Sequence, residues 1–406
     1  MIIRNPLQCT SCGARVITRT APGLFPPQEH TFPCPGCGVD IRFTLNRNKR
    51  KKLGFSFGRP VNARWIKSEK GAIATLNFDP DRVAPKDMTN IFSPFLAEAL
   101  KLSPAAHRAY AREEGMRRAW LRSQWPWIQR LIVHFDKRNL VLFDKEAKLK
   151  KDSPHATSWA TRLRLLYDLL ERAFDNFTLN RLPAMKRVHQ RVAVAQVGSP
   201  GLYDELTKQY VTSSRMMKTW QELNKIRTVF LANYLTLSPL LRVQYWSTPP
   251  KDLSELSMPE KKFDQLKQLY VDSFETLCRL TVIAVALEAI IHHKRLSIPT
   301  AKGEMSIWEY EAMPNGNKHT ILTKYPIHDL FVPAIDHRLR NGLGHHSATY
   351  VASTDEVVYY KQDEAELHES RVPYTQFAFR VLEIVSVVEL GALYFHPLHI
   401  TALEAE

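Results

Sequence analysis

The chain has 406 residues, and its contents of 44% hydrophobic and 24% charged residues are ordinary for a globular protein of about two to four domains. The most apolar run, Leu280 to Ile291, is interrupted by Glu288 and is too short to span a bilayer, which excludes a membrane-spanning class. No long apolar stretch follows Met1 as a signal peptide would require, so a cytoplasmic protein is expected.

The positive charge is concentrated in the first part of the chain. The formal net charge is +15, with 48 Lys and Arg against 26 Asp and Glu in residues 1–300 and 8 against 15 in residues 301–406. A basic surface attracts polyanions by releasing their counterions. We therefore expect the first 300 residues to bind nucleic acid, with solubility alone as the alternative reason for the charge.

Two pairs of cysteines near the N-terminus predict a metal site. Each pair has the spacing CxxC, a glycine follows each pair, and 21 residues separate them. This pattern is typical of a zinc ribbon, with short strands expected at 16–17 and 41–43, whereas a redox dithiol is the alternative. We predict one structural Zn²⁺ per chain, with no catalysis because four thiolates fill its coordination. The ligands would be Cys9, Cys12, Cys34 and Cys37.

A run of basic residues, NRNKRKK, follows the predicted ribbon directly. Flexible basic side chains beside a ribbon are suited to contact with the phosphates of nucleic acid. A solvated linker is the alternative interpretation. Residues 1–52 are therefore defined as a zinc ribbon with a basic tail, and its candidate substrate-binding residues are Lys49, Arg50, Lys51 and Lys52.

Residues 53–154 are expected to form a basic region of mixed α/β structure, with short strands that include residues 72–78. The stretch from Leu131 to Phe143 is predicted to be a β-hairpin because two apolar runs flank a polar turn. Several tryptophans of this region lie among arginines and would either stack on bases or anchor a core. The core interpretation is favoured, because Trp is mostly buried, for Trp120, Trp125 and Trp127.

The remaining chain has helical spacing almost throughout. Residues 155–250 are expected to be a helical connector that contains one long helix from Tyr203 to about Tyr234. Residues 251–406 are expected to form the last domain. Its first helix would start with the capping box at Ser257 and reach about His293, with an apolar second half buried as the spine of that domain.

Residues 336–346, with the sequence DHRLRNGLGHH, predict an amphipathic helix. Ile335, Leu339 and Leu343 are spaced four apart, so they should face a core. The polar residues should share the opposite side, and they are His337, Arg338, Arg340, Asn341 and His345. A solvated helix face that happens to carry these residues is the alternative.

These residue types are suited to phosphodiester chemistry. A guanidinium binds phosphate through a planar fork and stabilises added negative charge. An imidazole can take or give a proton near neutral pH. Because the 2′-hydroxyl of RNA is a built-in nucleophile, cleavage of RNA by such residues needs no metal.

The order Arg340, Asn341, three further residues and His345, written RNGLGH here, resembles the signature of HEPN domains. The resemblance covers about residues 255–400. It implies a mainly α fold whose C-terminal part is a HEPN-like helical bundle with a short β-hairpin at Ser347–Tyr360 and a long helix from about Pro373. Two glycines, Gly342 and Gly344, depart from the small helix formers usual there, so either another backbone approaches closely or the helix ends early.

The resemblance implies a metal-independent endoribonuclease that leaves a 2′,3′-cyclic phosphate. Arg340 would hold the scissile phosphate, His345 would move the proton, and Asn341 would orient one of these groups. Auxiliary substrate contacts would come from His337 and Arg338. Since one domain supplies one motif, the resemblance implies a homodimer or pairing with a related partner. Many relatives are toxins or antiviral-defence effectors that cut tRNA or other RNA, a role that would pair the chain with an antitoxin or activator protein.

Three other functions fit the same residues. The first is a catalytically inactive HEPN adaptor that dimerises, and the second is a DNA-binding regulator built on the ribbon and the basic residues. The third is a metalloenzyme that uses the histidine pairs at 292–293 and 345–346. RNA cleavage that is lost with His345 would separate the nuclease from the adaptor.

Overall fold

The computed structural model describes residues 3–21, 28–48, 54–78, 83–85, 101–148, 158–179, 181–246, 252–258, 261–301, 303–344, 348–351, 354–363 and 366–404. These residues form two compact units, each assembled from three segments of chain. Unit 1 consists of Met1–Ala111, Ala232–Gln268 and Arg338–Val381, and unit 2 of Arg112–Leu231, Leu269–His337 and Leu382–Glu406. The predicted domain boundaries near residues 52, 154 and 250 fall outside the described residues.

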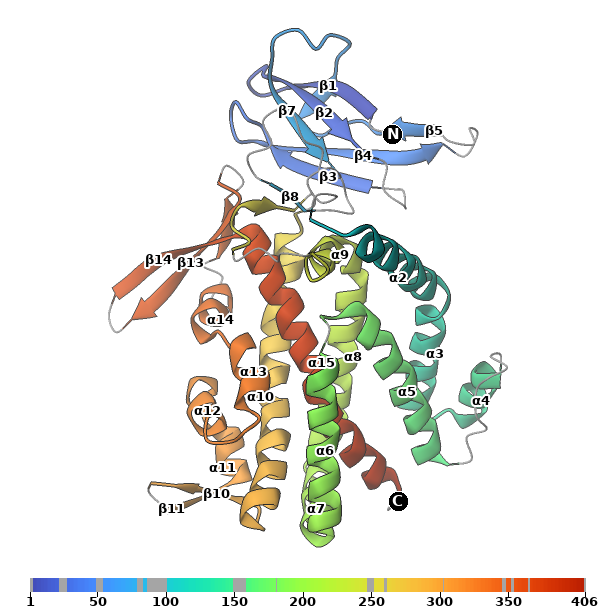
Figure 1. The fold of residues 1–406 in the computed structure, drawn as a ribbon, viewed down its shortest axis with the longest axis vertical. Coiled ribbons are helices and arrows are strands. Elements are labelled where there is room, and N and C mark those ends of the chain that lie inside the picture. The colour runs from blue at the N-terminus through green and yellow to red at the C-terminus, as the bar shows by residue number, and fades with distance from the viewer. Residues whose placement is uncertain are drawn as a thin grey trace. The chain divides into compact units, whose positions relative to one another are not determined.

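Unit 1 begins with a β-domain of two small sheets (Figure 1, blue). One sheet has the order β6-β1-β2-β7, and the other has the order β3-β4-β5. Alternate residues of β3 are buried, as expected for a strand with one face against a core. The predicted strands at 16–17, 41–43 and 72–78 are confirmed. The bounds are β1 (Ile3–Cys9), β2 (Arg15–Thr20), β3 (Gln28–Pro33), β4 (Asp40–Asn48), β5 (Gly54–Phe57), β6 (Ala63–Trp65) and β7 (Ala72–Phe78).

The strands that follow the predicted ribbon in the sequence belong to the same β-domain as the ribbon itself. Strand β6 pairs with β1 through Leu7 and Trp65, and β7 pairs in parallel with β2. Side chains from both sheets share a core that includes Val16, Ile41 and Phe43. The β-domain therefore extends through residue 78.

The rest of unit 1 contains a three-stranded antiparallel sheet of order β12-β13-β14. Its strands are β12 (Thr349–Val351), β13 (Glu356–Asp363) and β14 (Glu366–Pro373). The predicted hairpin is confirmed, because Thr349 pairs with Val358, and β14 adds a third strand before the last helix. Further elements are the strand pair β8 (Ala84–Pro85) and β9 (Leu256–Ser257), the helix α9 (Tyr234–Val243) and the motif helix α14 (His337–Gly344).

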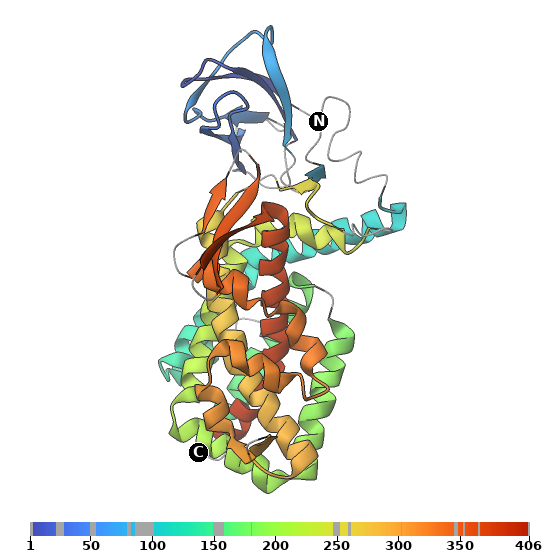
Figure 2. The same cartoon turned by 90° about the vertical axis from the view of Figure 1, so that its left-hand side faces the viewer.

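Unit 2 is a helical bundle around the middle of α10, whose residues from Leu280 to Ile290 are almost all buried, as predicted for a spine. Figure 2 shows the same helices from the side. Helices α2 (Pro104–Ser123), α10 (Phe263–His293) and α15 (Tyr374–Glu404) contain residues of both units. The remaining elements of unit 2 are α3 (Trp125–Asp136), α4 (Leu140–Lys148), α5 (Trp159–Phe177), α6 (Leu182–Gly198), α7 (Pro200–Thr212), α8 (Arg215–Ala232), β10 (Ser297–Thr300), β11 (Gly303–Ser306), α11 (Ile307–Ala312), α12 (Asn315–Leu322), α13 (His328–Phe331) and the 3₁₀-helix η1 (Val332–Ala334).

The hairpin predicted at 131–143 is wrong, because this stretch forms the end of α3, a turn and the start of α4. The buried residues Ile128, Leu131, Ile132 and Phe135 follow helical spacing, whereas a strand would also have buried Val133, which is 45% exposed. Asn139 then caps α4, since its side-chain oxygen accepts from the N–H of Leu142 at 3.1 Å. The polar turn joins helices instead of strands.

Two predicted helix boundaries also differ. The single helix expected from Tyr203 to Tyr234 is divided into α7 and α8, because Ser214 has a φ of +58° that ends the helical path. Helix α10 begins at Phe263, while Ser257 of the predicted capping box lies in strand β9. The burial of Trp125 and Trp127 agrees with the core interpretation. Within the described ranges, every helix is too short or too polar to cross a lipid bilayer.

Candidate metal centre and candidate nuclease helix

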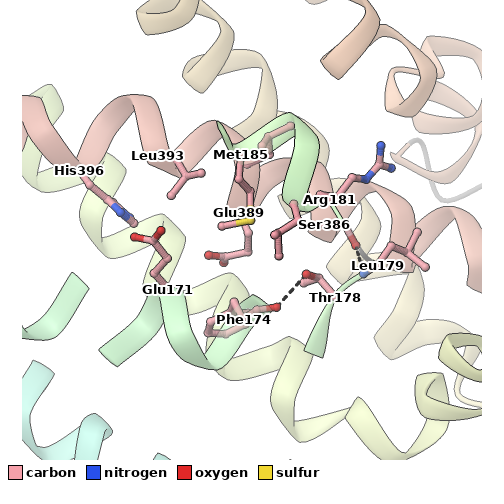
Figure 3. A pocket seen from close by; sticks show the side chains of 12 residues that line it. Glu171, Phe174, Thr178, Leu179, Arg181, Met185, Ser386, Glu389, Leu393 and His396 are labelled. Atoms are coloured by element: carbon pink, nitrogen blue, oxygen red, sulfur yellow. Dashed lines mark hydrogen bonds between the residues drawn. The ribbon is translucent and has the colours of Figure 1, made fainter. Parts of the chain in front are cut away.

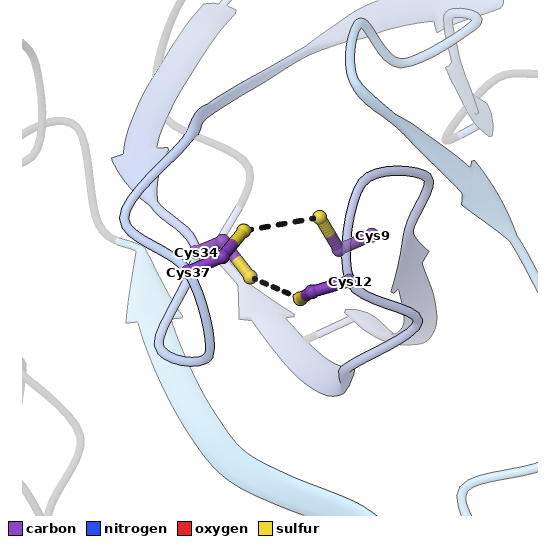
Figure 4. A group of neighbouring side chains, drawn as sticks. All are labelled: Cys9, Cys12, Cys34 and Cys37. Atoms are coloured by element: carbon purple, nitrogen blue, oxygen red, sulfur yellow. Dashed lines mark hydrogen bonds between the residues drawn. The ribbon is translucent and has the colours of Figure 1, made fainter.

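The four predicted cysteines come together at one end of the β-domain (Figure 4). Their sulfur atoms all lie within 4.8 Å of one another, with 3.8 Å between Cys9 and Cys37 and 3.6 Å between Cys12 and Cys34. Cys9 and Cys34 are buried, and the other two are exposed. The cluster therefore has four thiol groups at metal-binding distance.

The two CxxC turns have the same backbone geometry. In the first turn, the N–H of Cys9 donates to the carbonyl of Ala14 at 2.9 Å; in the second, the N–H of Cys34 donates to Val39 at the same distance. The glycines after the pairs have φ values of +76° and +75°, a conformation that a side chain would strain. Because β1 and β3 both lead into such a turn, the two pairs of thiol groups face one another.

The sulfur spacing fits a tetrahedral ion. Four thiolates at about 2.3 Å from Zn²⁺ would lie about 3.8 Å apart, close to the observed separations, whereas a disulfide needs about 2.05 Å. Burial opposes ionisation of Cys9, but the N–H groups of Cys12 and Ser11 donate to its sulfur and lower its pKa to about 7. A thiolate, the form that a metal binds, is thus accessible near neutral pH.

His30 lies outside the cysteine cluster. Its ring is 1% exposed and packs against Phe43 and Phe78 at centroid distances of 4.9 and 5.2 Å. Burial lowers its pKa to about 4, so it is neutral at physiological pH. In the described part of the chain, the group of metal-binding side chains consists of the four cysteines.

Helix α14 has the predicted division into apolar and polar sides. Leu339 and Leu343 are buried, whereas Arg338 and Asn341 are exposed and Arg340 is half-buried. The guanidinium of Arg340 donates to the side-chain oxygen of Asn341 at 3.2 Å. Two of the three predicted catalytic residues are therefore joined on the accessible side of the helix. Ile335 lies before α14 and is half-buried.

The other candidate residues for catalysis and substrate binding are either partly buried or lie outside the described residues. His337 is half-buried, and its ring packs edge to face on Phe274 at a centroid distance of 5.3 Å. The third catalytic candidate, His345, and its neighbour His346 lie outside the described residues. The same holds for the basic candidates Lys49, Arg50, Lys51 and Lys52.

Gly342 is explained by close packing within unit 1. A Cβ atom at this position would lie 2.3 Å from Cδ2 of Tyr359, a residue of strand β13. The close approach comes from a side chain and not from another backbone, and the described helix ends at Gly344. At Gly344 a Cβ would meet only the guanidinium of Arg340 at 3.7 Å, an ordinary contact. The sheet of β12, β13 and β14 therefore packs closely against α14 at Gly342 but not at Gly344.

Replacing Gly342 with alanine is expected to destabilise the protein by about 1 to 3 kcal/mol, because the added methyl group collides with Tyr359. The same change at Gly344 should be neutral or slightly stabilising, because alanine is favoured over glycine in a helix by about 1 kcal/mol. Thermal unfolding of the two variants measures the difference. Equal midpoints would contradict the packing described for α14.

The turn between β12 and β13 is held by Asp355, whose φ is +56°. Its carboxylate accepts hydrogen bonds from the hydroxyl groups of Tyr350 and Ser257, both at 2.9 Å, and lies 2.6 Å from the ammonium of Lys261. Its carbonyl accepts from the N–H of Tyr374 at 2.8 Å. One aspartate therefore ties the sheet beside α14 to the starts of α10 and α15.

Sequence reasoning did not identify a polar cavity in unit 2, which is lined by residues of α5, α6 and α15 that include Glu171, His189 and His396. These residues are far apart in the sequence and share no motif. The signal that could have indicated it is the interruption of the apolar pattern of α15 by His396 and Pro397. Comparison of the chain with protein-family models, with curated proteins and with solved structures gives no match.

Proposed function

We propose that the chain is a metal-independent endoribonuclease of the HEPN type. The observation that carries this proposal is the arrangement of α14, where Arg340 and Asn341 are hydrogen-bonded on the accessible side while Leu339 and Leu343 are buried. The RNGLGH order, the hairpin after it and the long helix α15 support it further. His345 would follow α14 by one residue.

The reaction follows from the roles of these side chains. The 2′-oxygen of RNA attacks the neighbouring phosphorus, and the bond from phosphorus to the 5′-oxygen breaks. His345 takes the proton of the 2′-hydroxyl or gives one to the leaving oxygen, while Arg340 neutralises the charge that builds on the phosphate. Asn341, held by Arg340, orients one of these groups. The products are a 2′,3′-cyclic phosphate and a 5′-hydroxyl.

The assembly and the biological role belong to the same proposal. Two chains would pair so that the motifs of both face one cleft, which makes a homodimer the active form. Cys9, Cys12, Cys34 and Cys37 would hold one Zn²⁺ that joins the two CxxC turns and takes no part in cleavage. The basic residues from Lys49 to Lys52 would contact RNA. As a toxin or antiviral-defence effector, the chain would cut tRNA or another RNA.

Mild expression in a bacterial host tests the activity. The wild type should arrest growth and give discrete new RNA ends, whereas Arg340→Ala and His345→Ala should lower cleavage by on the order of 10² to 10⁴-fold. Arg295→Ala is the matched control, because this arginine pairs with Glu304 and belongs to unit 2, whereas Arg340 belongs to unit 1. Sequencing of total RNA and mass spectrometry of the 3′ ends measure the outcome.

Three results would contradict the nuclease. A dimer that cuts no RNA would favour an inactive adaptor. Tight duplex DNA binding that is salt-sensitive and independent of Arg340 would favour a regulator. Equal cleavage by wild type and both motif variants would place the activity elsewhere on the chain.

A further inference from the structure

The cavity of unit 2 lies between α5, α6 and α15 and has a volume of about 280 Å³. A second, smaller space of about 30 Å³ shares lining residues with it, and Figure 3 shows the side chains around this second space. Glu171, Leu393 and His396 line both spaces. The volume of the larger space lies near the lower end of the range for small-molecule pockets, which begins at about 300 Å³.

His396 is a buried donor with a fixed tautomer. Its ring is 5% exposed and stacks on Tyr167 at a centroid distance of 3.8 Å. The guanidinium of Arg227, itself fully buried and paired with Glu389, donates to Nε2 of His396 at 3.3 Å. Because Nε2 accepts, the proton of the neutral ring is on Nδ1.

The ring of His396 is neutral and, within the described part of the chain, has a free donor at Nδ1. Burial and the positive charge of Arg227 hold its pKa well below the ordinary value, so the ring stays neutral at physiological pH. Among the residues that the structure describes, none is hydrogen-bonded to its Nδ1. This N–H is therefore open to the cavity, where a ligand with an acceptor group would pair with it.

Glu171 provides an acceptor beside this donor. The carboxylate is half-buried, and one of its oxygens lies 3.2 Å from Nε2 of His189. Figure 3 shows the carboxylate of Glu171 and the ring of His396 turned toward one another. Buried Leu393 and half-buried Ile400 add apolar surface to the same cavity.

A fixed N–H beside a carboxylate selects the chemistry of the ligand. A simple cation would leave the N–H unsatisfied. An anion would be repelled by the carboxylate, because the arginine that lines the cavity, Arg164, is already paired with Glu404. A metal ion is disfavoured, because the ring nitrogen that faces the cavity carries a proton. A ligand edge must instead offer an acceptor next to donors, as the pairing edges of nucleobases do.

Guanine matches this pattern best. Its O6 accepts from one N–H, and its N1–H and 2-amino group are two adjacent donors for one carboxylate. Adenine and cytosine offer one amino donor, and the single N–H of uracil lies between two carbonyl oxygens, one of which would face the carboxylate. We propose that the cavity of α5, α6 and α15 binds a guanine base, with O6 on His396 and the N1–H and 2-amino edge on Glu171. The inference is independent of the ribonuclease proposal.

Isothermal titration calorimetry of the full-length protein with guanosine, adenosine, cytidine and uridine tests the proposal. Guanosine should bind on the order of tenfold more tightly than the others, as expected for a well-formed bidentate contact to a base. Binding of 1-methylguanosine, which lacks the N1–H, should be on the order of tenfold weaker than binding of guanosine. This comparison uses the wild-type protein, so it holds even if a variant fails to fold.

A matched pair of variants isolates the carboxylate. Glu171→Gln should lose guanosine affinity by on the order of tenfold, while Glu205→Gln, which changes an exposed carboxylate on α7, should not. A short single-stranded RNA with one guanine distinguishes the source of the base. Glu171-dependent binding of this RNA without binding of guanosine would identify an RNA base, and binding of guanosine itself would identify a free nucleoside or nucleotide.

Several results would overturn the proposal. These are equal affinity for all four nucleosides, binding of 1-methylguanosine as tight as that of guanosine, unchanged affinity in a folded Glu171→Gln variant, and no binding of any of these probes. Because the readout is binding alone, it can fail while the RNA cleavage test succeeds, and the reverse also holds.

Discussion

Replacing Cys34 with serine is expected to abolish binding of the Zn²⁺ proposed for the cysteine cluster and to unfold the N-terminal β-domain, while the helices of unit 2 remain. The two sheets share a small core, so a metal bound by the four cysteines would supply much of their stability. A structural Zn²⁺ contributes on the order of 10 kcal/mol of folding free energy at neutral pH. Metal content per chain, with hydrogen exchange of the β-domain, measures the loss.

The control for this substitution is Cys278→Ser, which makes the same chemical change at a buried cysteine of α10. It should leave one metal per chain and normal exchange in the β-domain. A Cys34→Ser variant that kept both its metal and its slow exchange would show that the cysteine cluster is not the metal site.

Replacing Asp355 with alanine is expected to destabilise unit 1 by about 3 to 5 kcal/mol. Lys261 and Asp355 are 8% and 15% exposed, and removing one partner of a buried ion pair leaves a charge that is poorly compensated. The variant also loses the acceptor for Tyr350 and Ser257, and alanine is strained at a φ of +56°. Thermal unfolding and hydrogen exchange of β12 and β13 measure the effect.

Asp355→Asn is the matched variant, because asparagine keeps two polar atoms and tolerates the left-handed backbone. It should lose the attraction to Lys261 and keep most of the turn, so its cost should be clearly smaller. Adding Lys261→Met to Asp355→Ala should recover part of the lost stability, since the unpaired charge is then removed. If the two single variants at Asp355 were equally stable, the carboxylate would not hold this turn.

The sequence predicted best those features whose geometry is local. A CxxC turn is shaped by its own backbone hydrogen bonds and by a glycine, so the spacing alone indicated the cluster of Cys9, Cys12, Cys34 and Cys37. The two sides of α14 followed in the same way from helical periodicity, with Leu339 and Leu343 buried and Asn341 exposed.

Features that depend on distant packing could not be predicted. The apolar stretch around Leu131 fits a strand or a helix, and burial of Ile128 and Ile132 beside it decides for the helix. The reason for Gly342 lies in Tyr359, which periodicity cannot bring to it. The cavity depends on Glu171, His189 and His396 from three helices, and no spacing rule connects them.

The interleaving of the two units has a consequence for the newly made chain. Each unit takes its segments from both early and late parts of the sequence, and unit 1 needs Arg338–Val381 to be complete. On the ribosome, the helices that are synthesised first must therefore wait for the last quarter of the protein before either unit can close. Their apolar faces stay open during that interval, so we expect the nascent protein to need chaperones and a truncation near its C-terminal end to impair the folding of both units.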